Sequence, residues 1–298
     1  MIKPIVVGAD GSRESAAAAD WAAREALRRG LPLRLVHAWE GLPSQGTEAT
    51  LPELAAPQYW ARRVLRTMSE QLHARYPKLY VSTEQLRLPP GQALLAEAES
   101  AELLVLGNQG LGSVSGLFMG SVATATAAHT ARPLVLVRAG YTGDSERLPD
   151  PSGESPAHGP YRDVALAVDL RESCDEVLEF AFRAAEFRGA PLRVVHAWHV
   201  SLRRGVVGPD ERAAVKKRAE HELAVLLAPW RDKFPKVPAR ERVVEGHPTH
   251  HVVKAAGGAG LLVVGRRARR AAIGAHAGPV THAVIHHVDC PVAVVPHD

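Results

Sequence analysis

Short, continuous apolar runs alternate along the chain with amphipathic segments of helical length. In the first half this pattern predicts strands at residues 4–8, 33–38, 80–87, 102–106 and 133–138. Between these runs it predicts helices at residues 12–29, 58–75, 91–100 and 120–130. Strands that are apolar on both faces are typical of a parallel sheet covered by helices on both sides. We therefore expect a doubly wound α/β domain, which binds ligands at the carboxyl ends of its strands.

The second half of the chain repeats the first. Residues 29–39, RGLPLRLVHAW, and residues 188–198, RGAPLRVVHAW, agree at nine of eleven positions at an offset of 159. At the same offset Asp10 matches Asp169, and each follows an apolar run. With the offset shortened by one, the matches continue with Gly107 and Gly265, Gly120 and Gly278, and His129 and His287. Such a long register indicates two copies of one domain of roughly 140 residues.

A segment without apolar periodicity separates the two copies. Its sequence, AGYTGDSERLPDPSGESPAHGP, is rich in Gly, Pro, Ser and charged residues, which is typical of a linker. We therefore expect one domain at residues 1–139, a linker at 140–160 and a second domain at 161–298. The last apolar run of each copy would be an edge strand. Because apolar edges favour pairing, we expect the copies to join there as an intramolecular pseudo-dimer, with a homodimer of chains left open.

The composition is that of a soluble globular protein, with 46% hydrophobic and 23% charged residues. The two cysteines, Cys174 and Cys290, are too few for a disulfide framework and predict buried thiols in a reducing compartment. No apolar stretch reaches the length of a membrane span, about 18 residues, and the amino end does not resemble a signal peptide. We therefore expect a cytoplasmic protein without a membrane partner. A net charge of +4 does not indicate a nucleic-acid partner.

The stretch GNQGLGSVSGLFMGS, residues 107–121, directly follows the fourth predicted strand and so lies at the binding edge of the sheet. Gly107 and Gly110 can turn several N–H groups inward to form an anion-binding nest. Gly120 and Ser121 begin the next predicted helix, whose free N–H groups, dipole and hydroxyl suit a phosphate. The same residues also fit a tight turn followed by an ordinary N-cap, so their spacing alone leaves both interpretations open.

Taken together, these motifs resemble the universal stress protein family. The resemblance rests on Gly107-x2-Gly110-x9-Gly120-Ser121, on VVGADGS at the amino end and on LVHAW after the second strand, and it covers both copies. The glycine motif with its nine-residue gap is similar to that of the family's ATP-binding branch. The resemblance implies a five-stranded parallel sheet of the adenine nucleotide alpha hydrolase-like type in each copy. It also implies ATP between the first and fourth strands, Mg2+ or Mn2+ on the phosphates, and a role in stress survival or dormancy.

The resemblance also implies the residues of the site. Asp10 would lie beside the adenosine with the Gly8 backbone near it, and Ala38 would recognise adenine through its main chain. The ribose and phosphates would be enclosed by Gly107, Asn108, Gln109, Gly110, Leu111, Gly112 and Ser113. The terminal phosphates would be bound at the helix start by Gly120, Ser121, Val122 and Ala123. Asp10 has an alternative role, as the N-cap of the helix that begins near Arg13.

The second copy departs from the motif. Its loop reads GRRARRAAIGAHAGP, so that Ala268 replaces Gly110 and Pro279 replaces Ser121, while Leu170-Arg171 replaces Gly11-Ser12. The proline removes a hydroxyl and an N–H donor, and alanine disfavours positive φ. The residues of this degenerate second site would be Asp169, Ala197, Gly265, Arg266, Arg267 and Gly278. The four arginines of the loop could receive an anion, stabilise the other domain's phosphates or form a solvated loop.

We therefore expect an ATP-binding regulatory protein that responds to stress and acts on a partner protein, with its main site in the first copy. A weak ATPase or a nucleotide-transfer enzyme is one alternative, and a scaffold that binds no nucleotide is another. Residues 107–121 contain no Asp, Glu, His, Lys or Arg, so we expect hydrolysis to be weak at most. His282 and His286 lie on one face of a predicted helix, next to His287. No third ligand for a metal ion can be identified nearby, so we expect no metal site there.

Overall fold

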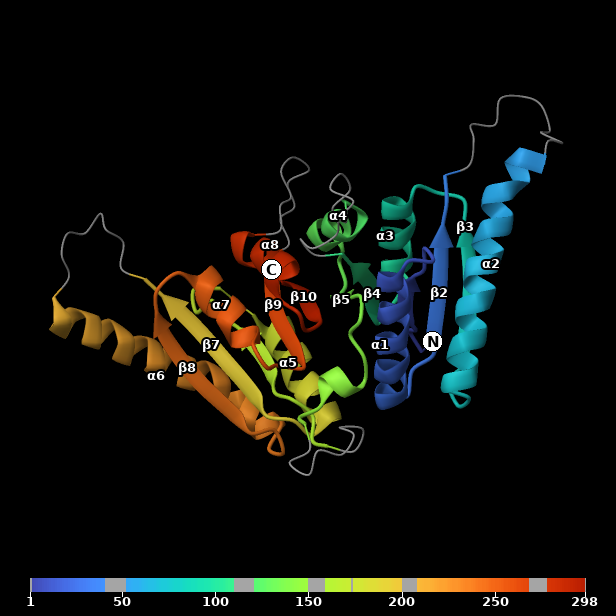
Figure 1. The fold of residues 1–298 in the computed structure, drawn as a ribbon. Helices are drawn as coiled ribbons and strands as arrows, with labels where there is room; N and C mark the ends of the chain where they lie inside the picture. Colours follow the sequence, from blue (N-terminus) through green and yellow to red (C-terminus); the bar gives the residue numbers. More distant parts are fainter. Residues whose placement is uncertain are drawn as a thin grey trace. The chain divides into compact units, whose positions relative to one another are not determined.

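The computed structural model describes residues 2–40, 52–109, 121–149, 159–172, 174–199, 208–267 and 278–297. It divides into two compact units, residues 1–142 and residues 143–298. The first unit contains β1 (Ile5–Gly8), α1 (Arg13–Arg29), β2 (Leu33–Ala38), α2 (Pro52–Arg75), β3 (Val81–Leu86), α3 (Pro90–Ser100), β4 (Leu103–Asn108), α4 (Ser121–His129) and β5 (Leu134–Arg138) (Figure 1). The expected alternation of strands and helices is confirmed, although α2 begins earlier than predicted.

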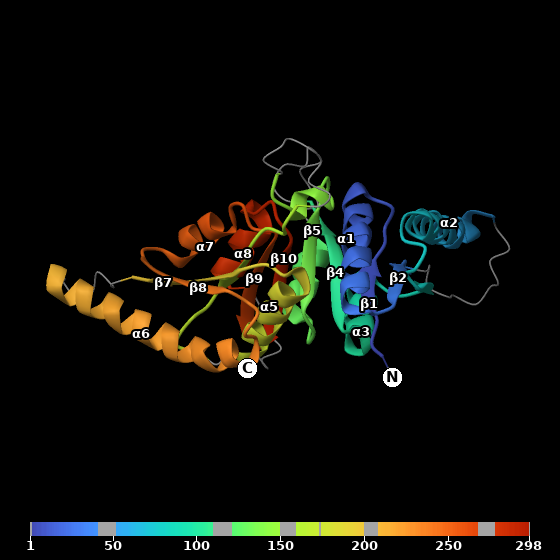
Figure 2. The ribbon, with the colours of Figure 1, turned by 90° about the horizontal axis from the view of Figure 1, so that it is seen from below.

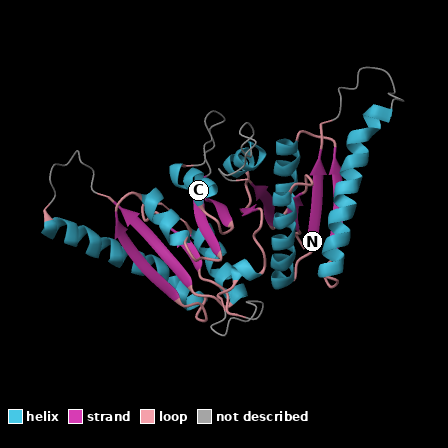
Figure 3. Cartoon of the chain, in the orientation of Figure 1, coloured by secondary structure: helices cyan, strands magenta, loops and turns pink. Residues whose placement is uncertain are grey.

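The second unit repeats this order (Figure 3). After a short 3-10 helix, η2 (Asp144–Glu146), its elements are β6 (Val164–Ala167), α5 (Asp175–Arg188), β7 (Leu192–Trp198), α6 (Pro209–Lys233), β8 (Ala239–Glu245), α7 (Pro248–Ala256), β9 (Leu261–Arg267), α8 (Pro279–His287) and β10 (Val292–His297). The sequence repeat is therefore a repeat of structure.

Each unit contains a parallel sheet of five strands, in the order β3-β2-β1-β4-β5 in the first unit and β8-β7-β6-β9-β10 in the second. Ile5 of β1 pairs with Leu33 on one side and with Leu103 on the other. The strand order thus reverses between β1 and β4, which is where a doubly wound sheet opens a crevice for ligands. In the first unit α1 packs beside α2 and α3 beside α4, and these two pairs cover opposite faces of the sheet (Figure 2). The predicted fold class is confirmed.

The shared RG-x-PLR motif has a structural cause in both units. Gly30 ends α1 with φ of 65° and Gly189 ends α5 with φ of 56°, so both adopt the left-handed conformation of a helix C-cap. In the first unit the N–H group of Leu31 donates to the carbonyl of Ala26 over 2.9 Å. Glycine tolerates this conformation without a steric cost, and the capped helix then turns directly into the next strand.

Part of the predicted linker is structured and belongs to the second unit. The N–H group of Leu148 donates to the carbonyl of Pro160 over 2.9 Å, and the guanidinium of Arg147 lies 4.0 Å from the ring centroid of Tyr161. Residues 150–158 lie outside the described part of the chain. The domain limits at 139 and 161 and the pairing of the two copies through their edge strands stay predictions.

Both cysteines are buried free thiols, as expected from their number. Burial raises the pKa of Cys174 to about 11 and that of Cys290 to about 12. The thiol form therefore predominates at neutral pH, which makes both side chains poor nucleophiles. No helix in the described residues is both long enough and apolar enough to cross a membrane.

Gly107 brings the end of β4 against the first turn of α1. A Cβ atom on Gly107 would lie 2.6 Å from the carbonyl carbon of Glu14 and 2.7 Å from the backbone nitrogen of Ser15. Because these are backbone atoms, the helix itself would have to move. We expect Gly107→Ala to lower the free energy of unfolding by about 1–3 kcal/mol, measured by urea denaturation followed by circular dichroism.

Gly91→Ala is the matched control for this variant. Nothing lies within 4 Å of a Cβ atom on Gly91, which is a residue of α3. Since alanine favours a helix more than glycine does, this variant should be neutral or slightly more stable. Equal urea midpoints for Gly107→Ala and wild type would show that the close approach of α1 to β4 does not require a glycine.

Candidate functional site

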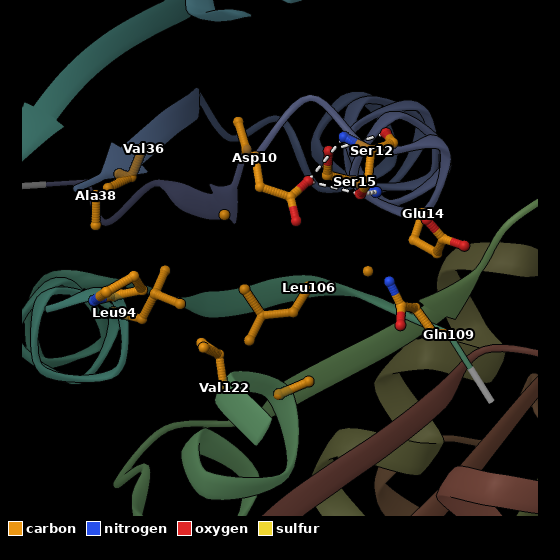
Figure 4. Close-up of a pocket in the computed structure, with 15 residues that line it drawn as sticks. Asp10, Ser12, Glu14, Ser15, Val36, Ala38, Leu94, Leu106, Gln109 and Val122 are labelled. Carbon is orange, nitrogen blue, oxygen red and sulfur yellow. Dashed lines mark hydrogen bonds between the residues drawn. The ribbon is translucent and has the colours of Figure 1, made fainter. Parts of the chain in front are cut away.

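A pocket with a volume of about 260 Å³ opens at the carboxyl edge of the first unit's sheet (Figure 4). Its walls come from the ends of β1, β2 and β4 and from the first turns of α1, α3 and α4. One part of the lining is apolar and consists of Val36, Ala38, Pro90, Leu94 and Leu106. The other part is polar and includes Asp10, Ser12, Glu14, Ser15 and Gln109. The pocket therefore lies at the switch point between β1 and β4.

The structure brings together half of the residues that the sequence assigned to the first site. Those that line the pocket are Gly8, Asp10, Ala38, Gly107, Gln109, Val122 and Ala123. Asn108 is buried within β4, where it pairs with Arg138, and it is not part of the lining. Outside the described residues lie Gly110, Leu111, Gly112, Ser113, Gly120 and the side chain of Ser121. These positions stay predictions.

Asp10 is held in a tight turn between β1 and α1. The N–H group of Ser12 donates to Oδ1 of Asp10 over 2.9 Å, and the hydroxyl of Ser12 donates to the same atom over 2.6 Å. Gly11 permits the turn because its φ of 85° favours glycine. Figure 4 shows the other carboxylate oxygen of Asp10 pointing into the pocket.

The N-cap of α1 is Ser12, so the alternative role expected for Asp10 is wrong. The Oγ atom of Ser12 accepts a hydrogen bond of 3.0 Å from the backbone N–H of Ser15. Desolvation raises the pKa of Asp10, but the hydrogen bonds from Ser12, Ser15 and its own backbone together lower it by more, so the pKa lies below its ordinary value. Asp10 is therefore ionised at neutral pH, with one oxygen occupied by the turn and the other directed at the pocket.

His37, in the LVHAW motif, supports the floor of the pocket without lining it. Its Nδ1 atom donates to the carbonyl of Ala9 over 2.6 Å, because a carbonyl oxygen can only accept. The N–H group of Ala9 in turn donates to the carbonyl of Val36 over 2.8 Å. His196 makes the same bond in the second unit, to the carbonyl of Val168 over 3.0 Å. The repeated histidine thus ties together the ends of two neighbouring strands.

The electrostatics of the pocket combine two acidic side chains with the start of a helix. Asp10 and Glu14 are the carboxylates among the described lining residues, which include no lysine or arginine. Val122 and Ala123 come from the first turn of α4, whose free N–H groups and dipole favour an anion. A positive charge that offsets these two carboxylates would therefore favour an anion at α4.

Several residues that line the pocket were not predicted from the sequence motif. Glu14 and Ser15 lie in the first turn of α1, far along the chain from the glycine motif, and Leu94 lies in α3. The signal for Glu14 was its place just after VVGADGS, where the first turn of a helix must face the binding edge. Leu94 carries no local signal, because only the packing of α3 brings it to the pocket.

In the second unit an arginine side chain binds the carboxylate that corresponds to Asp10. Arg171, which replaces Ser12, donates to Asp169 from Nε over 3.0 Å and from a terminal nitrogen over 2.8 Å. These hydrogen bonds from Arg171 lower the pKa of Asp169 and outweigh its desolvation. Both carboxylate oxygens of Asp169 therefore accept hydrogen bonds from Arg171, whereas Ser12 bonds to only one oxygen of Asp10.

The other residues expected at the second site have structural roles in the described part of the chain. Arg267 forms an ion pair with Glu172 of the turn before α5. Burial lowers the pKa of Arg266. A Cβ atom on Gly265 would lie 2.9 Å from the ring of His297, while Ala197 is paired within β7 and Gly278 is the N-cap of α8. Ala268, Arg269 and Arg270 lie outside the described residues.

The histidine before the last strand of the first unit caps its helix. The Nδ1 atom of His129 lies 2.8 Å from the carbonyl of Ala125, one of the last carbonyls of α4. The imidazole therefore bonds to a carbonyl near the end of α4, as histidines close to a helix C-terminus do. His129 is thus tied to the last turn of its own helix.

Comparisons with known proteins agree with the repeat. The model of the universal stress protein family matches residues 1–138 and 160–296. A universal stress protein of Mycobacterium tuberculosis is 31% identical over 97% of this chain and 96% of its own. One of Mycolicibacterium smegmatis is 30% identical over 98% of this chain and 96% of its own.

A solved structure shows the same fold over the full length of the chain. The crystal structure of a universal stress protein from Archaeoglobus fulgidus superposes with a TM-score of 0.67 at 13% identity. The match covers 99% of this chain and 98% of that one. Because the family model matches each half separately and the relatives match the whole length, this chain belongs to the universal stress protein family in its tandem form.

Proposed function

We propose that the first unit binds an adenine nucleotide, with ATP as the ligand, and that the protein acts as a nucleotide-dependent regulatory module of the stress response. The observation that carries the proposal is the pocket at the switch point, where an apolar slot adjoins an ionised carboxylate and the start of a helix. A nucleotide has the same sequence of chemical groups, with a flat base, a ribose rich in hydroxyls and an anionic chain.

We propose a place in the pocket for each part of the ligand. The base would pack between Val36, Leu94 and Leu106, with the main chain of Ala38 at its polar edge. The free oxygen of Asp10 would accept a hydrogen bond from a ribose hydroxyl, and a bond to a charged acceptor is stronger than one between neutral groups. The phosphates would extend toward the first turn of α4.

A divalent cation fits the polar end of this pocket. The lining contains two carboxylates, and its described residues include no lysine or arginine. The negative charge of the carboxylates would repel the phosphates. Oxygen donors are what Mg2+ and Mn2+ prefer, and such an ion on the phosphates would supply the missing positive charge. Glu14 is the carboxylate that would face it, since the pocket-facing oxygen of Asp10 is assigned to the ribose. A cytoplasmic location, a homodimer and a regulated partner protein stay predictions.

Replacing Asp10 tests the placement of the ribose. Asn keeps an oxygen for the hydrogen bonds from Ser12 but loses the charge, so we expect Asp10→Asn to weaken ATP binding in Mg2+ by about 1.5–3 kcal/mol, or roughly 10–100-fold in Kd. Isothermal titration calorimetry measures this. Asp169→Asn is the matched control and should leave ATP binding unchanged, because the carboxylate of Asp169 is engaged by Arg171.

Two outcomes of that titration would contradict different parts of the proposal. If wild-type protein shows no saturable binding at millimolar ATP with Mg2+, the first unit is not an ATP site. If Asp10→Asn binds ATP as tightly as wild type, the nucleotide is not placed against β1. Gly110→Val, in the predicted phosphate loop, is a further variant that should weaken binding if the loop encloses the phosphates.

Replacing Glu14 tests the electrostatics of the phosphate end. We expect wild type to bind ATP more weakly in EDTA than in Mg2+. Glu14→Gln should strengthen binding in EDTA by about 1 kcal/mol, or about fivefold, since it removes one nearby negative charge. Calorimetric titrations with and without Mg2+ measure both values, with the exposed Glu99→Gln as a control on α3. An unchanged Kd for Glu14→Gln in EDTA would place the phosphates away from α1.

A further inference from the structure

The long helix α6 lies on the outside of the second unit and carries an apolar segment, residues 223–230 (Figure 2). The sequence of this segment is LAVLLAPW, without a charged side chain. Leu223 and Leu227 are fully buried, because this side of α6 packs against β8 and α5. Val225 lies between them on the opposite side of the helix, since successive residues are rotated by about 100°, and it is 59% exposed. The segment therefore presents apolar side chains to solvent as well as to the core.

The first unit has a polar surface at the same place. At the shorter offset of the repeat the segment aligns with residues 65–72, LRTMSEQL, in α2. There Arg66 and Glu70 form an ion pair on the exposed side of the helix, and α6 has alanine at both positions. Thr67 is exposed and corresponds to Val225. The fold therefore does not require an apolar surface here, and a continuous apolar patch of this kind marks a site of interaction.

A pocket with a volume of about 440 Å³ lies along the exposed side of this segment. Its walls combine apolar and charged side chains, which are Val225, Leu226, Pro229, Trp230, Lys233 and Asp175 of α5. The ring of Trp230 stacks on Phe182 of α5 with the centroids 6.1 Å apart. Because this stacking fixes the indole, the pocket is formed before a partner arrives.

The charges at the two ends of this surface have opposite signs. One face of α6 carries four residues at spacings of four, three and four, which are Glu222, Leu226, Pro229 and Lys233. In an antiparallel pair of such helices, related by a two-fold axis at the middle of this face, Glu222 of each copy lies opposite Lys233 of the other. The ion pairs that these two residues form within the chain, to Arg218 and Glu179, lie at the surface and leave both charges accessible. The face is therefore complementary to itself when the helices are antiparallel.

We propose that this face of α6 is the surface through which two copies of the chain associate as a two-fold dimer, with their α6 helices antiparallel. A second copy is the partner that these observations favour, because it brings a matching apolar surface and the opposite charge at each end. In this arrangement the first unit keeps its candidate site, and the second unit supplies the contact between chains. The dimer therefore forms without nucleotide.

Sedimentation velocity of the full-length chain, without nucleotide and over a range of concentrations, tests the proposal. Wild type should dimerise reversibly. Val225→Arg should raise the Kd of the dimer by at least about tenfold, because each copy would then bring an unpaired charge into an apolar contact. Glu222→Lys should also weaken the dimer. Glu222→Lys combined with Lys233→Glu should dimerise more tightly than Glu222→Lys alone, because opposite charges face each other again.

Thr67→Arg is the matched control, because Thr67 is the exposed counterpart of Val225 in α2. It should leave the Kd of the dimer unchanged, and circular dichroism checks that each variant is folded. The proposal is overturned if wild type stays monomeric at submillimolar concentrations, if Val225→Arg dimerises as tightly as wild type, or if Thr67→Arg causes an equal loss. A charge swap that restores no affinity would exclude the antiparallel arrangement.

Discussion

The close approach of α1 to the end of β4 is the contact on which the candidate site depends. Gly107 leaves no side chain between the strand and the backbone of Glu14 and Ser15, so the first turn of the helix lies directly on the binding edge of the sheet. This position brings Asp10, Ser12 and Glu14 into one wall with Gln109 of the neighbouring segment. A larger residue would separate the end of β4 from the first turn of α1 and divide the polar part of the pocket.

The same contact changes the interpretation of the glycine motif. Gly107 could have served the close approach of a ligand, but the atoms nearest to its missing side chain belong to α1. Its counterpart Gly265 is likewise enclosed by the chain, next to His297 and Val177. The glycines that both copies share at this strand end are therefore required for packing.

Much of the fold could be predicted from the sequence because its cause is local. Continuous apolar runs such as Leu103–Leu106 are buried, as expected for a strand in a sheet covered on both faces. The glycines shared by the two copies mark the residues where helices end. The parts of the site that follow a strand directly, such as Asp10 and Ala38, could be placed for the same reason. The capping role of Ser12 was missed because Asp10 and Ser12 are both good N-cap residues, and only the turn at Gly11 decides between them.

The ion pair between Asp169 and Arg171 has a consequence for how the protein can respond to a ligand. The two copies share one architecture, yet in the second copy Asp169, the counterpart of Asp10, is neutralised within its own turn. If nucleotide enters only the first unit and the chain acts as a monomer, occupancy follows a simple hyperbola with one ligand per chain, because no second equivalent site couples to it. Such a protein reports nucleotide concentration in a graded way over about two decades, instead of switching sharply at a threshold.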